Sequence, residues 1–166
     1  MIVPEALVHM LKPWNDYYSH SKGTETVVQY LHIGGLVLAG GLAVSADRGT
    51  LRALRIAAAD RTHYTRELGA VHRWVLTGLT IVVLSGIALL ASDIETFFGS
   101  WMFWTKMTLV ALLLLNGLQM TRVEAALRQD ASDASPHWPK LRRTAITSLV
   151  LWFIITAFGV SLVNLA

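Results

Sequence analysis

Two ionisable residues interrupt long apolar stretches of the sequence: Lys106 in WTKMTLVALLLLNG and His32 in YLHIGGLVLAGG. A polar ionisable group in hydrocarbon is costly, so residues of this kind mark candidate functional sites in membrane proteins. A neutral imidazole is a common ligand of haem iron. A lysine can ligate a metal when burial deprotonates it, or pair with an anionic group while it remains charged. These residue types therefore point to metal or cofactor binding.

Each of the two residues also has an explanation that needs no chemistry. The long side chain of Lys106 can extend to the nearer membrane interface. The imidazole of His32 can form a hydrogen bond to a neighbouring helix. The sequence alone leaves these alternatives open.

Four long apolar runs contain or surround these residues, at 27–46, 74–91, 101–121 and 145–165. Hydrophobic residues make up 54% of the 166-residue chain and charged residues 15%, which differs from ordinary soluble domains. Each run can cross a hydrocarbon core of about 30 Å as a helix, and none alternates as a barrel strand does. The sequence predicts an all-α fold, an integral membrane four-helix bundle forming one domain over 27–166.

The remaining N-terminal segment, 1–26, is predicted to be an amphipathic helix on the outer membrane surface. It has no basic region and no continuous apolar core of a signal peptide, so we expect it to stay in the mature chain. Pro13 should bend or interrupt the helix. Apolar and aromatic residues recur at helical spacing and define one face: Val3, Leu7, Met10, Leu11, Trp14, Tyr17 and Tyr18.

The distribution of basic residues predicts the orientation. Of the 14 Lys and Arg residues, the segment 47–73 holds six and the segment 122–143 holds five. Short loops rich in Lys and Arg remain in the cytoplasm, so both termini should lie on the other side of a bacterial inner membrane. Topology and anionic lipids account for the net charge of +3, and no nucleic acid partner is expected.

With this topology, His32 and Lys106 should lie at similar depth near the outer surface and could line one cavity. Below His32, the same helical face carries Gly35 and Ala39. Such a face accommodates either a closely packed helix or a flat cofactor. His72 begins the second run at the inner surface, about 20 Å of helical rise from the depth of His32, so one iron cannot take both histidines.

Copper is the alternative metal. His9 and His20 flank the outer end of the bundle and, with Met10, could lead a metal toward His32. Scattered histidines and methionines outside the membrane are more often solvated or used in packing. The chain has no cysteine, which excludes disulfides, iron–sulfur clusters and thiolate ligands.

The segment HIGGLVLAGGLAVSADR resembles the first helix of the haem-binding alternative protoporphyrinogen oxidase family, in which a histidine precedes a Gly-Leu pair and an arginine. Here these are His32, Gly41, Leu42 and Arg48. The run WMFWTKMTLVALLLLNG resembles the third helix of that family, with its tryptophan and lysine before a leucine-rich stretch. The wider group of related four-helix proteins includes the copper-resistance D family, which is associated with copper uptake.

The resemblance covers the first three spans and implies a b-type haem near His32. Lys106 would be a second ligand or a partner of a propionate group. The chain departs from the family pattern at Asp47, where that family has proline, and it lacks a second histidine in 49–59. These departures concern the oxidase activity more than the architecture.

Three hypotheses follow. The first is a membrane protein that binds haem b, with an electron-transfer or oxidoreductase role and a redox partner. The second is a copper or other metal transport protein. The third is an accessory structural subunit of a larger membrane complex, or a homo-oligomer, in which the glycine-rich first span serves packing.

Overall fold

The chain forms six helices in the computed structural model, which describes residues 3–55, 58–129 and 135–165, apart from the side chains of 58–70, 72 and 163–165. All described residues outside helices lie in caps and short connections, which confirms the predicted all-α fold. The helices are α1 (Glu5–His20), α2 (Lys22–Ala53), α3 (Ala58–Ser92), α4 (Ile94–Gly99), α5 (Trp101–Gln129) and α6 (His137–Leu165).

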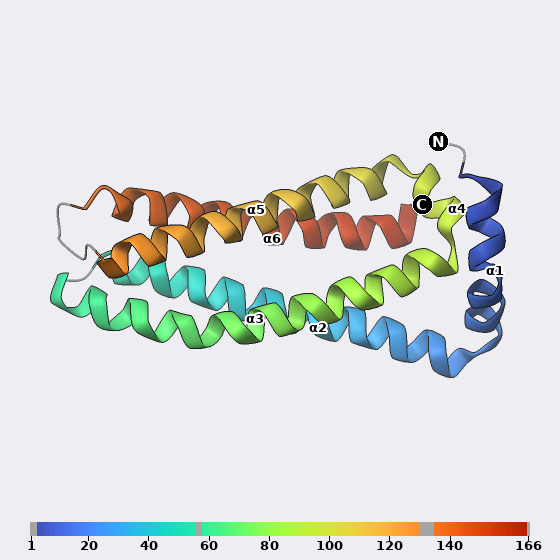
Figure 1. Ribbon diagram of the computed structural model, residues 1–166, viewed down its shortest axis with the longest axis horizontal. Helices are drawn as coiled ribbons and strands as arrows, with labels where there is room; N and C mark the ends of the chain where they lie inside the picture. The colour runs from blue at the N-terminus through green and yellow to red at the C-terminus, as the bar shows by residue number, and fades with distance from the viewer. Residues whose placement is uncertain (1–2, 56–57, 130–134, 166) are drawn as a thin grey trace.

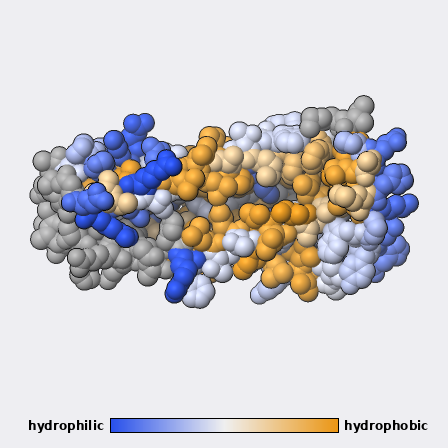
Figure 2. All heavy atoms as spheres, viewed as in Figure 1, coloured by the Kyte–Doolittle hydropathy of each residue, from blue (hydrophilic) through white to orange (hydrophobic). Residues whose placement is uncertain are grey.

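The four long helices α2, α3, α5 and α6 are the membrane-spanning elements. Each contains a stretch that is long and apolar enough to cross a bilayer, namely Lys22–Ala53, Arg73–Ser92, Trp101–Gln129 and His137–Leu162. Figure 2 shows a broad hydrophobic surface over the middle of the bundle, with hydrophilic residues gathered mainly toward its two ends. This is the surface of a multi-pass membrane protein.

The helices are longer than the apolar runs that predict them. α2 extends beyond 27–46 at both ends, and α6 begins at His137 rather than at 145. At the start of α2, the hydroxyl of Ser21 accepts a hydrogen bond from the backbone N–H of Thr24 at 3.3 Å. Backbone hydrogen bonding continues through polar residues, because good helix formers do not need a hydrocarbon environment.

The bundle consists of two helical hairpins. α2 packs along α3, α5 packs along α6, and the two pairs meet mainly where α2 contacts α6 (Figure 1). The core between the hairpins comprises Ala39, Leu113, Leu151, Trp152 and Ile155. Gly40 allows the contact between α2 and α6, because a Cβ there would lie 3.1 Å from Cε3 of Trp152.

Helix α1 lies across the ends of α2 and α3 (Figure 1). The indole of Trp14 donates a hydrogen bond to the carbonyl of Ala88 at 2.9 Å, and the amide of Asn15 donates to that of Ser92 at 2.6 Å. α1 continues through Pro13, so the predicted interruption does not occur; proline removes a single backbone hydrogen bond there.

The predicted apolar face of α1 is only partly engaged. Leu7, Leu11, Trp14 and Tyr18 are half-buried, whereas Met10 and Tyr17 are exposed by 68% and 59%. The side chains that remain exposed are apolar or amphipathic, as they are in helices that lie at a membrane interface.

Helices α2 and α3 approach each other closely at two glycines. A Cβ at Gly78 would lie 2.8 Å from the backbone nitrogen of Ala39 and 3.0 Å from its Cβ. One at Gly35 would lie 3.0 Å from side-chain atoms of both Ile81 and Val82. Contact of backbone against backbone requires residues this small.

We expect Gly78→Ala to lower the free energy of unfolding by about 1–3 kcal/mol, because the added methyl group would push apart two backbones that have no flexible side chain between them. Denaturant unfolding in mixed micelles would measure this. The matched control is Gly117→Ala in α5, where an added Cβ meets nothing within 4 Å. Equal stability of the two variants would show that α2 and α3 do not approach this closely.

Candidate functional site

His32 is held by two groups of α3. Its Nδ1 lies 3.1 Å from the carbonyl oxygen of Val82 and 3.1 Å from the hydroxyl oxygen of Ser85. The Ser85 hydroxyl donates its own proton to the carbonyl of Ile81 at 2.6 Å. Both atoms that face Nδ1 are therefore acceptors, so Nδ1 carries the proton and donates it. Nε2 is left with the lone pair.

The imidazole ring fits against a glycine of α3. A Cβ at Gly86 would lie 3.2 Å from Cε1 and 3.6 Å from Nδ1 of His32. Gly86 therefore gives the ring the room to approach α3 and reach Ser85. The hydrogen bond between helices, one of the two explanations that the sequence leaves open for His32, is present.

Lys106 comes from the other hairpin. Its side chain is half-buried and lies over Gly159 of α6, with Nζ 3.6 Å from the position of a Cβ on that glycine. His32 and Lys106 lie close enough to interact electrostatically. In the described part of the chain Lys106 forms no salt bridge. The two ionisable groups thus come from different hairpins to one region of the bundle.

The space beside Gly35 and Ala39 is filled by α3. Ile81 and Val82 contact Gly35, and Ala39 is fully buried against Gly78. The sequence left open either a packed helix or a flat cofactor on this face, and the structure has the packed helix. In the described residues, the neighbours of Gly35 and Ala39 on this face are Gly78, Ile81 and Val82 of α3.

The outer histidines do not join His32. His9 and His20 lie on exposed positions of α1, and Nδ1 of His20 is 2.7 Å from the carbonyl oxygen of Asp16. His9 lines a cavity of about 310 Å³ between α1 and the start of α4. Among the described residues, no three or more His, Asp or Glu side chains gather as a metal would require. The side chains of His63 and His72 lie outside the described residues.

Asp47 is a buried acid, although the sequence predicts that it begins the basic loop 47–73. The structure continues α2 past it to Ala53, and Asp47 is only 2% exposed. The hydroxyl of Ser148, on α6, donates a hydrogen bond to its carboxyl group, and Glu124 of α5 interacts with it electrostatically. A carboxyl group in such a position is costly, and so it is a candidate functional group.

Further polar groups are buried on α2, α5 and α6. Thr50, one turn along α2, is 1% exposed, and within the described residues neither its hydroxyl nor Oδ2 of Asp47 has a hydrogen-bond partner. The buried amide of Asn116 donates to the carbonyl of Thr144 at 2.9 Å. The unpaired polar atoms of Asp47 and Thr50 can hold an internal water molecule.

One signal in the sequence pointed to the burial of Asp47. It lies on the same helical face as His32, Gly35 and Ala39, because these three follow at steps of three and four residues and Asp47 comes eight residues, or two further steps of four, after Ala39. A face that is buried at its start and continues as helix is buried at Asp47 as well. The apolar run ends at residue 46, so hydropathy alone assigned Asp47 to a loop. Hydropathy does not mark where a helix ends.

The fold and its apolar surface define a four-helix multi-pass membrane protein with a terminal surface helix. The chain belongs to DUF6644, a family of unknown function, which matches residues 16–163. No curated protein and no solved structure matches the chain. The family found is thus neither of the haem-binding or copper-resistance families that the sequence resembles.

Ser148→Ala should lower the free energy of unfolding by about 1–3 kcal/mol, because it leaves the buried carboxyl group of Asp47 without its donor. In an Asp47→Asn background the loss should differ by at least about 0.5 kcal/mol, since groups in direct contact are energetically coupled. Unfolding of the four proteins of this cycle in mixed micelles gives the coupling. Ser45→Ala, on an exposed position of α2, is the control. Additive effects of the two substitutions would contradict the contact.

Proposed function

We propose that this membrane protein binds a b-type haem through Nε2 of His32 and transfers electrons within or across the outer half of the bilayer. The observation that supports this proposal is the fixed tautomer of His32. In histidines that ligate metals, the N–H of the other ring nitrogen usually donates a hydrogen bond to a carbonyl or carboxylate, which orients the ring and raises its basicity. Val82 and Ser85 act on His32 in this way.

In this proposal the porphyrin lies on the side of His32 toward Lys106. Two observations support that location: α3 already packs against Gly35 and Ala39, and Lys106 acts electrostatically on His32. Four-helix bundles commonly hold cofactors between facing helices. Haem supplies reversible one-electron chemistry at a potential set by its ligands and surroundings.

Lys106 has one of two roles in this proposal. As a neutral amine it would be the second axial ligand, and as an ammonium it would pair with a propionate group. Gly159 leaves room for the lysine side chain against α6. The copper alternative has no comparable support, because among the described residues His9 and His20 belong to no group of three or more side chains that could hold a metal.

We expect the purified protein, supplied with haem, to show a Soret band that shifts on reduction. His32→Ala should lose it, because the histidine that anchors the iron in this proposal is removed, while His20→Ala, an exposed histidine of α1, should retain it. Ser85→Ala should weaken haem retention by about tenfold, because only Val82 would still orient the ring. Lys106→Ala should alter the band. Visible absorption and haem content per protein would measure all four.

A colourless wild-type protein, or equal haem content in His32→Ala and wild type, would overturn the proposal. A Soret band unchanged in Lys106→Ala would assign that residue to neither haem role. If no variant changes the spectrum but His32→Ala breaks up an assembly, a structural subunit is the correct reading.

We also infer that α1 and both termini face away from the cytoplasm, on the basis of the basic residues at the opposite end of the bundle. Because the chain has no cysteine, single cysteines can report on this. A membrane-impermeant maleimide added to intact cells should label Lys12→Cys but label Arg128→Cys only after permeabilisation. Leu115→Cys, exposed on the apolar surface, should resist labelling in both conditions. The reverse pattern at the first two positions would invert the topology.

A further inference from the structure

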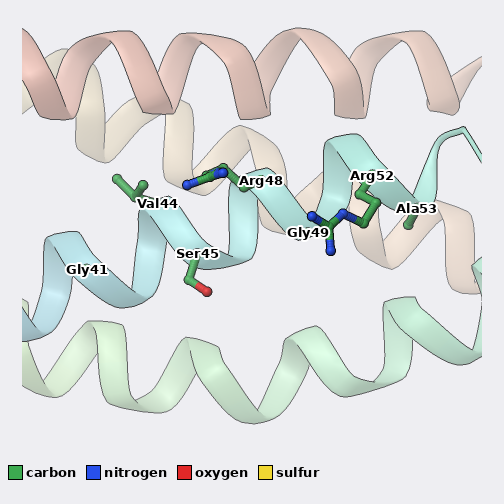
Figure 3. Close-up of a pocket in the computed structure, with 7 residues that line it drawn as sticks. All are labelled: Gly41, Val44, Ser45, Arg48, Gly49, Arg52 and Ala53. Carbon is green, nitrogen blue, oxygen red and sulfur yellow. The ribbon is translucent and has the colours of Figure 1, made fainter.

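A groove runs along α2 at the end of the bundle opposite α1. Its volume is about 560 Å³, within the range of small-molecule sites. Figure 3 shows its floor, formed by α2 with α3 and α6 on either side. The described residues that line it are Gly41, Val44, Ser45, Arg48, Gly49, Arg52 and Ala53.

One end of the groove is strongly basic. Arg48 and Arg52 are one turn apart on the same face of α2, and both are exposed. Figure 3 shows the guanidinium group of Arg48 directed toward Val44 and that of Arg52 lying over Gly49. Within the described residues neither guanidinium forms a salt bridge. Two neighbouring exposed cations at the edge of an apolar span attract an anion from outside the bundle.

The other end of the groove is lined by small side chains and borders the apolar surface of the bundle. Gly41, Ser45 and Gly49 follow one another at a spacing of four residues, and a Cβ at Gly41 would meet nothing within 4 Å. On the same helix, Val37 is 69% exposed, so the groove opens toward the apolar surface of the bundle. An acyl chain fits a furrow of this kind, whereas a soluble anion gains nothing from it.

We propose that this groove binds an anionic phospholipid, with its phosphate group between Arg48 and Arg52 and one acyl chain along Gly41 and Val44. Guanidinium groups bind phosphate through charge-assisted hydrogen bonds, and basic groups near a membrane surface attract anionic lipids. The proposal is independent of haem binding, because its residues lie on a different part of α2 from His32.

The experiment measures lipid binding to the delipidated protein in mild detergent by native mass spectrometry, using phosphatidylglycerol and phosphatidylcholine with matched acyl chains. We expect phosphatidylglycerol to bind at least tenfold more tightly, with an affinity that falls as salt rises. Arg48→Gln and Arg52→Gln should each weaken it by about fivefold, and together by about thirtyfold. The double variant Arg122→Gln with Arg128→Gln, exposed on α5, should bind as wild type does.

A second pair of variants tests the acyl-chain part of the groove without changing charge. A Cβ at Gly41 would meet nothing within 4 Å, so we expect the fold to tolerate Gly41→Leu while the added side chain occupies the groove and weakens lipid binding by at least tenfold. Gly34→Leu is the matched control, because a Cβ there also meets nothing within 4 Å and the residue lies outside the groove. This pair decides the question even if the arginine variants fail to fold.

Three results would overturn the proposal. The first is equal binding of the two lipids by the wild-type protein. The second is equal loss in Gly41→Leu and Gly34→Leu, which would place the lipid elsewhere. The third is displacement of phosphatidylglycerol by inorganic phosphate at similar concentrations, which would make the groove a site for free anions.

Discussion

The structure depends on the contact between α2 and α3 at Gly35, Ala39 and Gly78. Lipid surrounds these helices, so the hydrophobic effect gives little preference for one helix neighbour over another. Close contact between small residues provides that preference through dispersion and shape. Once the two backbones meet at this level, the rotation of α2 is fixed, and with it the neighbour of every other residue on that helix.

The fixed rotation of α2 assigns a different environment to each of its faces. One turn before Gly35, it directs His32 toward Val82 and Ser85 and sets the tautomer of the imidazole. Two turns after Ala39, it buries Asp47 against Ser148 of α6. Toward the end of α2, the groove lies beside these buried residues, with Arg48 and Arg52 exposed. The same helix thus carries the proposed haem ligand, the buried acid and the proposed lipid site.

The two hairpins contribute unequally to the candidate haem site. α2 and α3 build a rigid wall in which His32 is held by hydrogen bonds and by the space beside Gly86. α5 and α6 contribute Lys106, whose long side chain has several rotatable bonds and no salt bridge in the described residues. A fixed ligand opposite an adaptable cation suits a site in which one group sets the position of a cofactor and the other adjusts to its charge.

The sequence by itself determined the four spans, because hydropathy over about 20 residues depends on composition and not on neighbours. It also identified His32 and Lys106, since an ionisable residue within an apolar run is visible without a structure. Only the tertiary structure decided what these groups contact. The sequence leaves Gly35 and Ala39 open as a cofactor face or a helix contact, and only the tertiary structure shows that α3 packs against them. The hydropathy of the sequence assigned Asp47 to a loop, whereas in the structure it is buried next to Ser148 of α6. Burial depends on which helices surround a side chain.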